Sequence, residues 1–281
     1  DRNLGLINFD KALFSHIVYA ISNLSRSVIL AITNARYSKS PVNTNTKRYY
    51  QHINRYSAAF AVASDFAMLS LGGELKKKEL LSARLGDVLS SIYLASTVLK
   101  HYENQGCKPE DLPLVQWSVR TLMYEAQEKL HSFLKNLPNK TLAFFLRCYI
   151  FPRGRSYSPP PDDLTKKVSH IITSTGEARE RLSEYAYTTI EPGNPLGLLQ
   201  DALLLSEETA LIEAKINQAK KDGLIKSDYL GYQIKEAETQ KLLSSKEINQ
   251  LRELHQKVSE LLSVDDFHPN EIGRKTQGEK I

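Results

Sequence analysis

The chain has 281 residues, 41% of them hydrophobic, so it can form one large domain or two ordinary domains with buried cores. Its net charge is +5, and its cysteines, Cys107 and Cys148, lack the paired spacing of a disulfide framework or a metal site, which indicates reduced thiols. No apolar window of about 20 residues is uninterrupted, so we expect no integral membrane protein. Because the chain starts at Asp1 without a leader, we expect it to be a piece of a longer protein.

The first segment has apolar residues spaced three and four apart from Phe9 to Val28, which predicts an amphipathic helix. A second set, which includes Phe14 and Val18, widens the apolar stripe. We therefore expect residues 17–32 to form a buried helix of a bundle rather than a membrane span.

Residues 48–106 predict two long packed helices. The first is capped by Asn45 or Thr46 and extends to about Leu71, and the second covers about residues 74–102. The intervening Gly72-Gly73 pair costs roughly 2 kcal/mol of helix propensity, so a break is expected there. A further helix covers about residues 114–134. Four antiparallel helices with short loops predict an all-α, up-down bundle.

The character of the chain changes after the dense apolar run at residues 142–151. The next residues, 152–163, are basic and rich in proline, which cannot continue a helix. We place the internal boundary here, with a helical bundle at residues 1–152 and a smaller helical extension at residues 153–281. The extension should hold helices at about residues 163–174, 176–186, 195–221, 227–243 and 245–262, followed by a polar, loose tail after residue 266.

No catalytic or metal site can be assigned from the side chains. Glu79, Glu125 and Glu128 lie among polar residues and are interpreted as surface charges, because a catalytic base needs neighbours that tune it. The seven histidines show no metal-binding spacing, and His52 is interpreted as a hydrogen-bonded bundle residue. The glycines do not form a phosphate-binding loop.

Several segments in order resemble the C-terminal region of the long bacterial (FadE-type) acyl-CoA dehydrogenases. These segments are Phe9-Asp-Lys-Ala-Leu-Phe-Ser-His-Ile17, Leu71-Gly-Gly-Glu-Leu-Lys76, Leu81-Ser-Ala-Arg-Leu-Gly-Asp-Val-Leu-Ser90, Asp111-Leu-Pro-Leu-Val-Gln-Trp117, Ile150-Phe-Pro-Arg-Gly-Arg155, Asn194-Pro-Leu-Gly-Leu-Leu199 and Val264-Asp-Asp-Phe267. The resemblance runs nearly end to end and is weakest at residues 206–241.

The resemblance implies an FAD enzyme of fatty-acid β-oxidation that converts long-chain acyl-CoA to trans-2-enoyl-CoA. In the family, a glutamate in a Glu-Gly-Ala/Thr-Asn-type segment removes the α-proton, and this segment and the flavin contacts lie upstream of the region matched here. No such segment occurs in this chain, so no catalytic, cofactor or metal residue is carried over. The implied partners are the upstream catalytic domain, further copies of the chain and an electron-transfer flavoprotein, in the bacterial cytoplasm.

One segment remains a candidate for an additional contact. Residues 140–167 carry +4 of the +5 net charge, which suits phosphate, an anionic membrane surface or an acidic partner. The residues expected to contact the inner membrane or a partner are Phe144, Phe145, Arg147, Arg153, Arg155 and Tyr157. The alternative is that they dock onto the bundle or the catalytic domain.

Two rival functions stay open. A free-standing helical scaffold or membrane-surface module would need no flavin domain. Nucleic-acid binding is not expected, because the aromatic residues are not interleaved with arginines in a stacking pattern.

Overall fold

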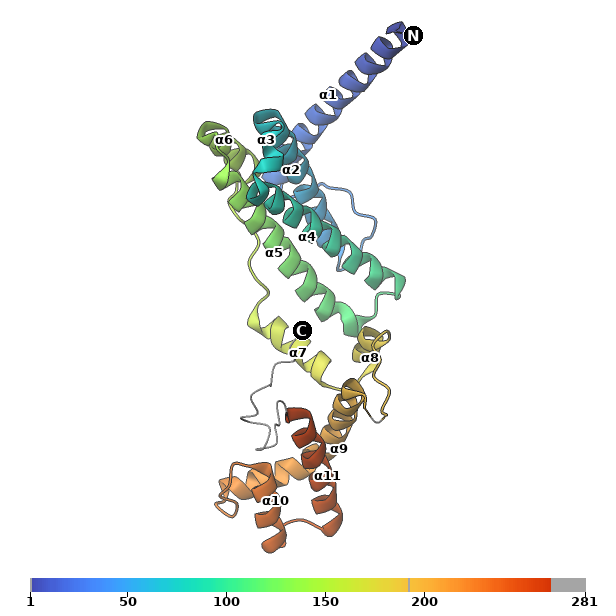
Figure 1. The fold of residues 1–281 in the computed structure, drawn as a ribbon, viewed down its shortest axis with the longest axis vertical. Coiled ribbons are helices and arrows are strands. Elements are labelled where there is room, and N and C mark those ends of the chain that lie inside the picture. Colours follow the sequence, from blue (N-terminus) through green and yellow to red (C-terminus); the bar gives the residue numbers. More distant parts are fainter. Residues whose placement is uncertain (1, 192, 264–281) are drawn as a thin grey trace, which may run out of the picture. The chain divides into compact units, whose positions relative to one another are not determined.

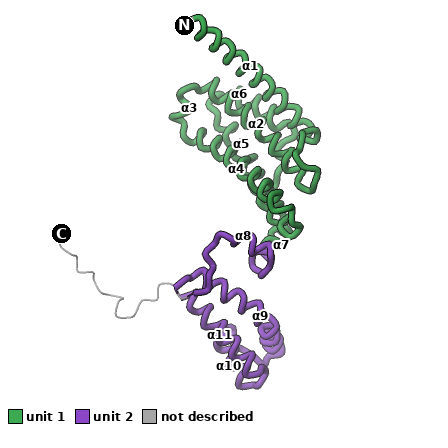
Figure 2. Tube along the Cα trace, turned by 90° about the vertical axis from the view of Figure 1, so that its right-hand side faces the viewer, with its two compact units in different colours: residues 1–168 green, residues 169–281 purple. Residues whose placement is uncertain are grey.

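The computed structural model describes residues 2–191 and 193–263, and these residues form helices and loops without a strand (Figure 1). The all-α fold class expected from the sequence is confirmed. The chain divides into two compact units, residues 1–168 and residues 169–281 (Figure 2). The predicted polar tail after residue 266 lies outside the described residues.

Unit 1 contains the longest helices. In chain order they are α1 (Arg2–Ile32), α2 (Lys47–Leu71), α3 (Glu74–Lys77), α4 (Glu79–Asn104), the 3-10 helix η1 (Pro109–Asp111), α5 (Leu112–Asn136) and α6 (Lys140–Ile150). Helix α7 (Asp162–Thr173) begins in unit 1 and ends in unit 2.

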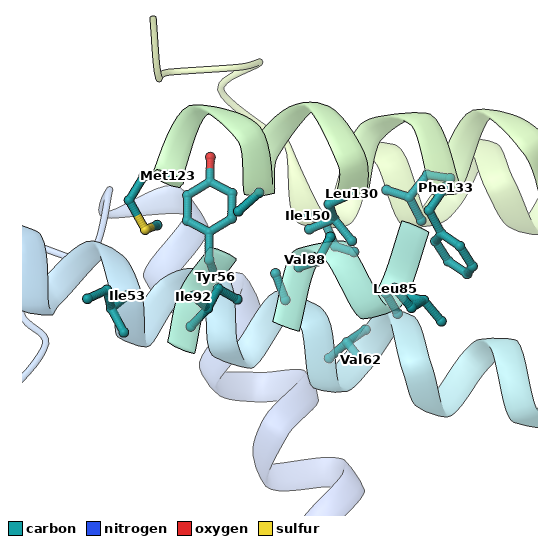
Figure 3. Close-up of a cluster of buried hydrophobic side chains, with 14 of the residues drawn as sticks. Ile53, Tyr56, Val62, Leu85, Val88, Ile92, Met123, Leu130, Phe133 and Ile150 are labelled. Carbon is teal, nitrogen blue, oxygen red and sulfur yellow. The ribbon is translucent and has the colours of Figure 1, made fainter. Parts of the chain in front are cut away.

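The core of unit 1 lies between α2, α4, α5 and α6. Tyr56 of α2, Leu99 of α4 and Phe133 of α5 are almost completely buried there. Figure 3 shows this cluster, with side chains from α2, α4 and α5 directed into one layer. Burying a large apolar side chain contributes roughly 1.5–3 kcal/mol, so this layer is the main source of stability of unit 1.

The expected break at Gly72-Gly73 is present. Gly72 has φ +51°, a left-handed conformation that side chains with a Cβ rarely adopt, and its amide donates to the Met68 carbonyl at 2.8 Å. The helix expected at residues 74–102 is interrupted once more at Lys78, which has ψ 63°. The Leu75 carbonyl accepts from the Ser82 hydroxyl at 2.7 Å, which compensates for the interruption.

The prediction that residues 17–32 form a buried bundle helix is confirmed only for the C-terminal part of this range, where Asn23, Ser27, Leu30 and Ala31 are buried. Only the C-terminal part of α1 packs on α2 and α6, and the N-terminal part projects away from the rest of unit 1 (Figure 1). Its Ile17, Val18 and Ile21 are 42%, 67% and 59% exposed. The fourth member of the core is α6, because its buried Ala143, Leu146 and Ile150 fill the place that was assigned to α1.

The proline-rich connector packs on unit 1, which explains why this unit extends to residue 168 rather than to residue 152. Gln127 of α5 is fully buried, and its side chain forms two hydrogen bonds with the backbone of Tyr157. Its Oε1 accepts from the Tyr157 amide at 2.9 Å, and its Nε2 donates to the Tyr157 carbonyl at 3.0 Å. The Tyr56 hydroxyl donates to the same Oε1 at 3.1 Å, so one side chain joins α2, α5 and the connector.

Unit 2 contains α8 (Glu177–Ser183), α9 (Pro195–Lys221), α10 (Leu230–Thr239) and α11 (Ser245–Leu262). Helices α9, α10 and α11 share a small core that includes Ile216, Ile234 and Leu251. The expected start of α11 is confirmed by a reciprocal cap: Glu247 donates its amide to the Ser244 hydroxyl at 3.4 Å, and its carboxylate accepts from the Ser244 amide at 2.8 Å.

Candidate functional site

The six residues expected to contact a membrane or a partner do not form one surface. Phe144 and Phe145 of α6 are 53% and 64% exposed, and their ring centroids lie 5.7 Å apart. They lie outside the face of α6 that buries Leu146 and Ile150 in the core. These two phenylalanines therefore form an exposed apolar pair.

The other four residues contact the bundle to different extents. Arg153 donates to the Ile32 carbonyl at 3.3 Å, and Arg155 forms an ion pair of 2.7 Å with Glu128. The Tyr157 ring packs against the His52 ring, with the centroids 5.1 Å apart. Arg147 is partly buried, and its Nε lacks a hydrogen-bond partner. Arg153, Arg155 and Tyr157 thus tie the connector to unit 1.

The packed C-terminal part of α1 buries both polar and apolar residues against the bundle, among them Leu30 and Ala31. Asn23 and Ser27 are 3% and 1% exposed, and neither the Asn23 Nδ2 nor the Ser27 Oγ has a hydrogen-bond partner. Many large apolar side chains of α1, most of them on its projecting N-terminal part, are exposed. We call this set the α1 apolar surface: Leu4, Leu6, Ile7, Phe9, Leu13, Phe14, Ile17, Val18, Tyr19, Ile21, Ile29 and Ile32.

The α1 apolar surface is larger than a soluble surface normally leaves uncovered, and contiguous patches of this kind mark interaction sites. By length and composition alone, the stretch Asn3–Ile32 is also apolar enough to cross a membrane. A helix that is buried against protein passes the same criterion, so composition alone does not identify what covers α1.

A polar cavity of about 320 Å³ lies beside the start of α2 in unit 1. We call it the arginine pocket. Its walls come from the loop after α1, from α2, from α5 and from the connector. The wall residues that matter here are Asn34, Arg48, His52, Arg120, Ser156 and Tyr157.

A third arginine, Arg55, does not line the arginine pocket but contacts residues that do. The Arg55 Nη1 donates to Asn34 Oδ1 at 2.9 Å and to Ser156 Oγ at 3.1 Å, and both acceptors belong to residues that line the pocket. Arg55 is only 3% exposed. Among the described residues, no carboxylate lies within ion-pair distance of Arg48, Arg55 or Arg120.

The chemistry of His52 follows from its neighbours. Burial, together with the charges of Arg48 and Arg55, lowers the pKa of His52 to about 4, so its ring is neutral at pH 7. The His52 Nε2 lies 3.1 Å from the Arg48 Nη2. Since a guanidinium only donates, Nε2 must accept, and the ring proton resides on Nδ1. That Nδ1 is buried and has no partner.

Sequence reasoning missed the arginine pocket, although one signal was present. Arg48, His52 and Arg55 are spaced four and three apart, which places them on one side of α2. Their spacing was visible, but Arg120 and Ser156 approach from distant parts of the chain, which spacing along one helix does not reveal.

The described residues offer no acid–base centre or metal cluster. Glu79 and Glu125 are exposed, and Glu128 is paired with Arg155. Within the described ranges, no group of three or more His, Cys, Asp and Glu side chains could hold a metal ion.

The family of the chain is identified by comparison with protein-family models. The model described as acyl-CoA dehydrogenase, C-terminal, bacterial type, matches residues 1–267. No solved structure gives a significant match. The match spans nearly the whole chain and includes both compact units. The chain therefore belongs to the bacterial-type acyl-CoA dehydrogenase C-terminal family.

Proposed function

We propose that this chain is the C-terminal helical part of an FAD-dependent enzyme that oxidises long-chain acyl-CoA to trans-2-enoyl-CoA in fatty-acid β-oxidation. The family match over residues 1–267 carries the proposal. The long-chain preference, the pathway and the flavin are the finer parts, and they rest on the resemblance of the sequence to FadE-type enzymes.

The catalytic glutamate and the flavin site belong, in this proposal, to the upstream part of the enzyme. When bound there, FAD accepts the hydride from the substrate β-carbon. The residues of this chain do not fit FAD on their own. The polar cavity beside the start of α2 holds only about 320 Å³, at the lower end of the range for small-molecule sites, and two arginines line it. We therefore assign no step of flavin chemistry to the described residues.

The role proposed for this chain is to cover and support the catalytic part through the α1 apolar surface. Helix α1 buries its polar Asn23 and Ser27 against unit 1 and leaves Phe14 and Val18 outside. Each large apolar side chain contributes roughly 1.5–3 kcal/mol when it leaves water, so covering such a surface strongly favours association. The catalytic part of the same polypeptide is the occupant we propose, because the family is defined as the C-terminal part of a larger enzyme.

Contact with a membrane is the second candidate role. It is favoured by the length and composition of α1 and by the exposed pair Phe144 and Phe145. Bound in this way, the enzyme would lie peripherally on the inner membrane, whereas the first candidate places it free in the bacterial cytoplasm. A homo-oligomer and an electron-transfer flavoprotein are the further partners we propose, and nucleic acid is not one of them.

The activity of the full-length protein tests the proposed reaction. We expect the purified protein to be yellow with bound FAD and to reduce an artificial electron acceptor with palmitoyl-CoA. A Phe14→Asp variant should lose at least about tenfold in activity, because burying a carboxylate at an apolar contact costs several kcal/mol.

The matched control is Leu211→Asp, which places the same charge on an exposed residue of α9 that lies outside the core of unit 2. This variant should keep wild-type activity. A colourless protein that is inactive on acyl-CoA of every chain length contradicts the proposed reaction. Equal activity of the Phe14→Asp and Leu211→Asp variants contradicts the proposed role of α1.

A further inference from the structure

The arginine pocket collects positive charge without a carboxylate to balance it. Arg48 and Arg120 line the pocket. Arg55 donates hydrogen bonds to the side chains of two lining residues, Asn34 and Ser156. The nearby Glu128 is already paired with Arg155. Two guanidinium groups therefore line a small cavity and a third lies behind its wall, in a region where unpaired positive charges are costly.

The buried polar atoms around the pocket also lack acceptors. Arg55 is 97% buried, yet its Nη2 has no hydrogen-bond partner. The Nδ1 of His52, which carries the ring proton, has no partner either. Buried donors are satisfied in most proteins, and each donor without an acceptor costs about 1–3 kcal/mol. An anion held by Arg48 and Arg120 in the pocket would offset the positive charge that these unpaired buried groups add to the region.

The start of α2 adds a third, independent sign. Its first turn carries no acidic residue, although acidic residues are favoured at the positive end of a helix dipole, and it contains Lys47 and Arg48 instead. Thr46 precedes the helix without a side-chain cap, and the amides of Lys47 and Tyr49 donate to the Thr44 and Thr46 carbonyls at 3.0 Å. The start of α2 therefore contributes positive side-chain charge to this region rather than free amides.

We propose that the arginine pocket is a binding site for a phosphate group, carried by a small molecule or by a lipid headgroup. Guanidinium groups match the geometry of phosphate oxygens, because their donors lie in a planar fork. The volume of about 320 Å³ exceeds what one phosphate fills, since a water molecule occupies about 30 Å³. The pocket therefore has room for a phosphate group that belongs to a larger ligand. This site is separate from the acyl-CoA oxidation proposed above and does not depend on it.

Phosphate binding is measured on the full-length protein by isothermal titration in a phosphate-free buffer of constant ionic strength. The probes are inorganic phosphate, coenzyme A, dephospho-coenzyme A, and vesicles of phosphatidylcholine with and without phosphatidic acid. An Arg120→Gln variant should bind the effective probe about tenfold more weakly, because one charge-assisted hydrogen bond is lost. Arg120 is chosen because it lines the pocket without a hydrogen bond to the rest of unit 1 among the described residues.

The control variant is Arg84→Gln, since Arg84 of α4 donates only to the Leu80 carbonyl of its own helix. It should bind every probe like the wild type. An Arg48→Gln variant provides a second test within the pocket and should also weaken binding.

The probes separate the two sources of the phosphate group. Binding of inorganic phosphate or coenzyme A identifies a soluble ligand, and loss of coenzyme A binding when the 3′-phosphate is absent identifies the bound group. Binding that requires phosphatidic acid in the vesicle identifies a lipid headgroup. Either result supports the site if the Arg120→Gln variant weakens it. If the wild type binds no probe, or the Arg120→Gln and Arg84→Gln variants bind alike, the proposal is overturned, whatever the dehydrogenase activity.

Discussion

Replacing Gln127 by Leu should lower the free energy of unfolding of unit 1 by about 3 kcal/mol or more. Gln127 is completely buried, and its amide satisfies the Tyr56 hydroxyl and both backbone groups of Tyr157. Leucine has a similar size but leaves the Tyr157 amide and carbonyl without a partner and removes one of the partners of the Tyr56 hydroxyl, which also interacts with the Ser156 side chain. Each unsatisfied buried group costs about 1–3 kcal/mol, partly relieved if the connector moves into water.

Urea unfolding of the 281-residue chain measures this effect. The fluorescence of Trp117, the single tryptophan, reports on unit 1 because this residue belongs to α5. Gln116→Leu is the matched control, since Gln116 lies on the same helix without a hydrogen bond among the described contacts. Its effect should stay within about 0.5 kcal/mol. Equal losses in the two variants would show that Gln127 does not hold the connector.

Acidification should destabilise unit 1 through His52. The pKa of His52 is about 4 in the folded chain, mainly because of burial and then because of Arg48 and Arg55, whereas an unfolded histidine has a pKa of about 6.5. The unfolded state therefore takes up the proton first. The contribution of His52 to stability is constant above about pH 7, decreases as the pH falls below 6.5, and levels off near pH 4 after a loss of up to about 3 kcal/mol.

The pH dependence is isolated by comparing variants in a phosphate-free buffer. His52→Gln retains an acceptor for Arg48 but cannot be protonated, so the free energy of unfolding should fall less between pH 7.5 and pH 4.5 than in the wild type. His101→Gln changes an exposed histidine of α4 and should retain the wild-type slope. The charged and titratable groups around His52 are Arg48, Arg55 and Tyr157. Identical slopes for the wild type and His52→Gln would contradict the explanation.

The helices were predictable from the sequence because each has its own local signals. Gly72-Gly73 ends α2, Asn194 and Pro195 start α9, and the reciprocal cap of Ser244 and Glu247 starts α11. What covers a helix is a different question. The apolar stripe of α1 shows that one side avoids water, but it does not say whether the bundle, another protein part or lipid provides the cover. For this reason the bundle was expected to cover more of α1 than its C-terminal part.

The arginine pocket and the contact between Gln127 and Tyr157 could not be predicted from the sequence for a related reason. Gln127 and Tyr157 are 30 residues apart, and Arg55 and Ser156 are 101 residues apart. Contacts between residues so far apart in the sequence depend on how the connector packs against α2 and α5. A proline-rich segment has no periodic pattern from which this packing could be predicted. The sequence did indicate that residues 140–167 are basic. It did not show that Arg153, Arg155 and Tyr157 are engaged by the bundle.

Hydroxyl-radical footprinting of the full-length protein, without lipid, tests the role of α1 most directly. The probes are the native aromatic residues Phe9, Phe14 and Tyr19 of the α1 apolar surface, and the internal references are Tyr37 and Tyr185, which are 85% and 92% exposed. If the catalytic part covers α1, the three probes should be oxidised far more slowly than the references. Oxidation of Phe9, Phe14 and Tyr19 as fast as Tyr37, or protection that appears only when vesicles are added, would contradict this role.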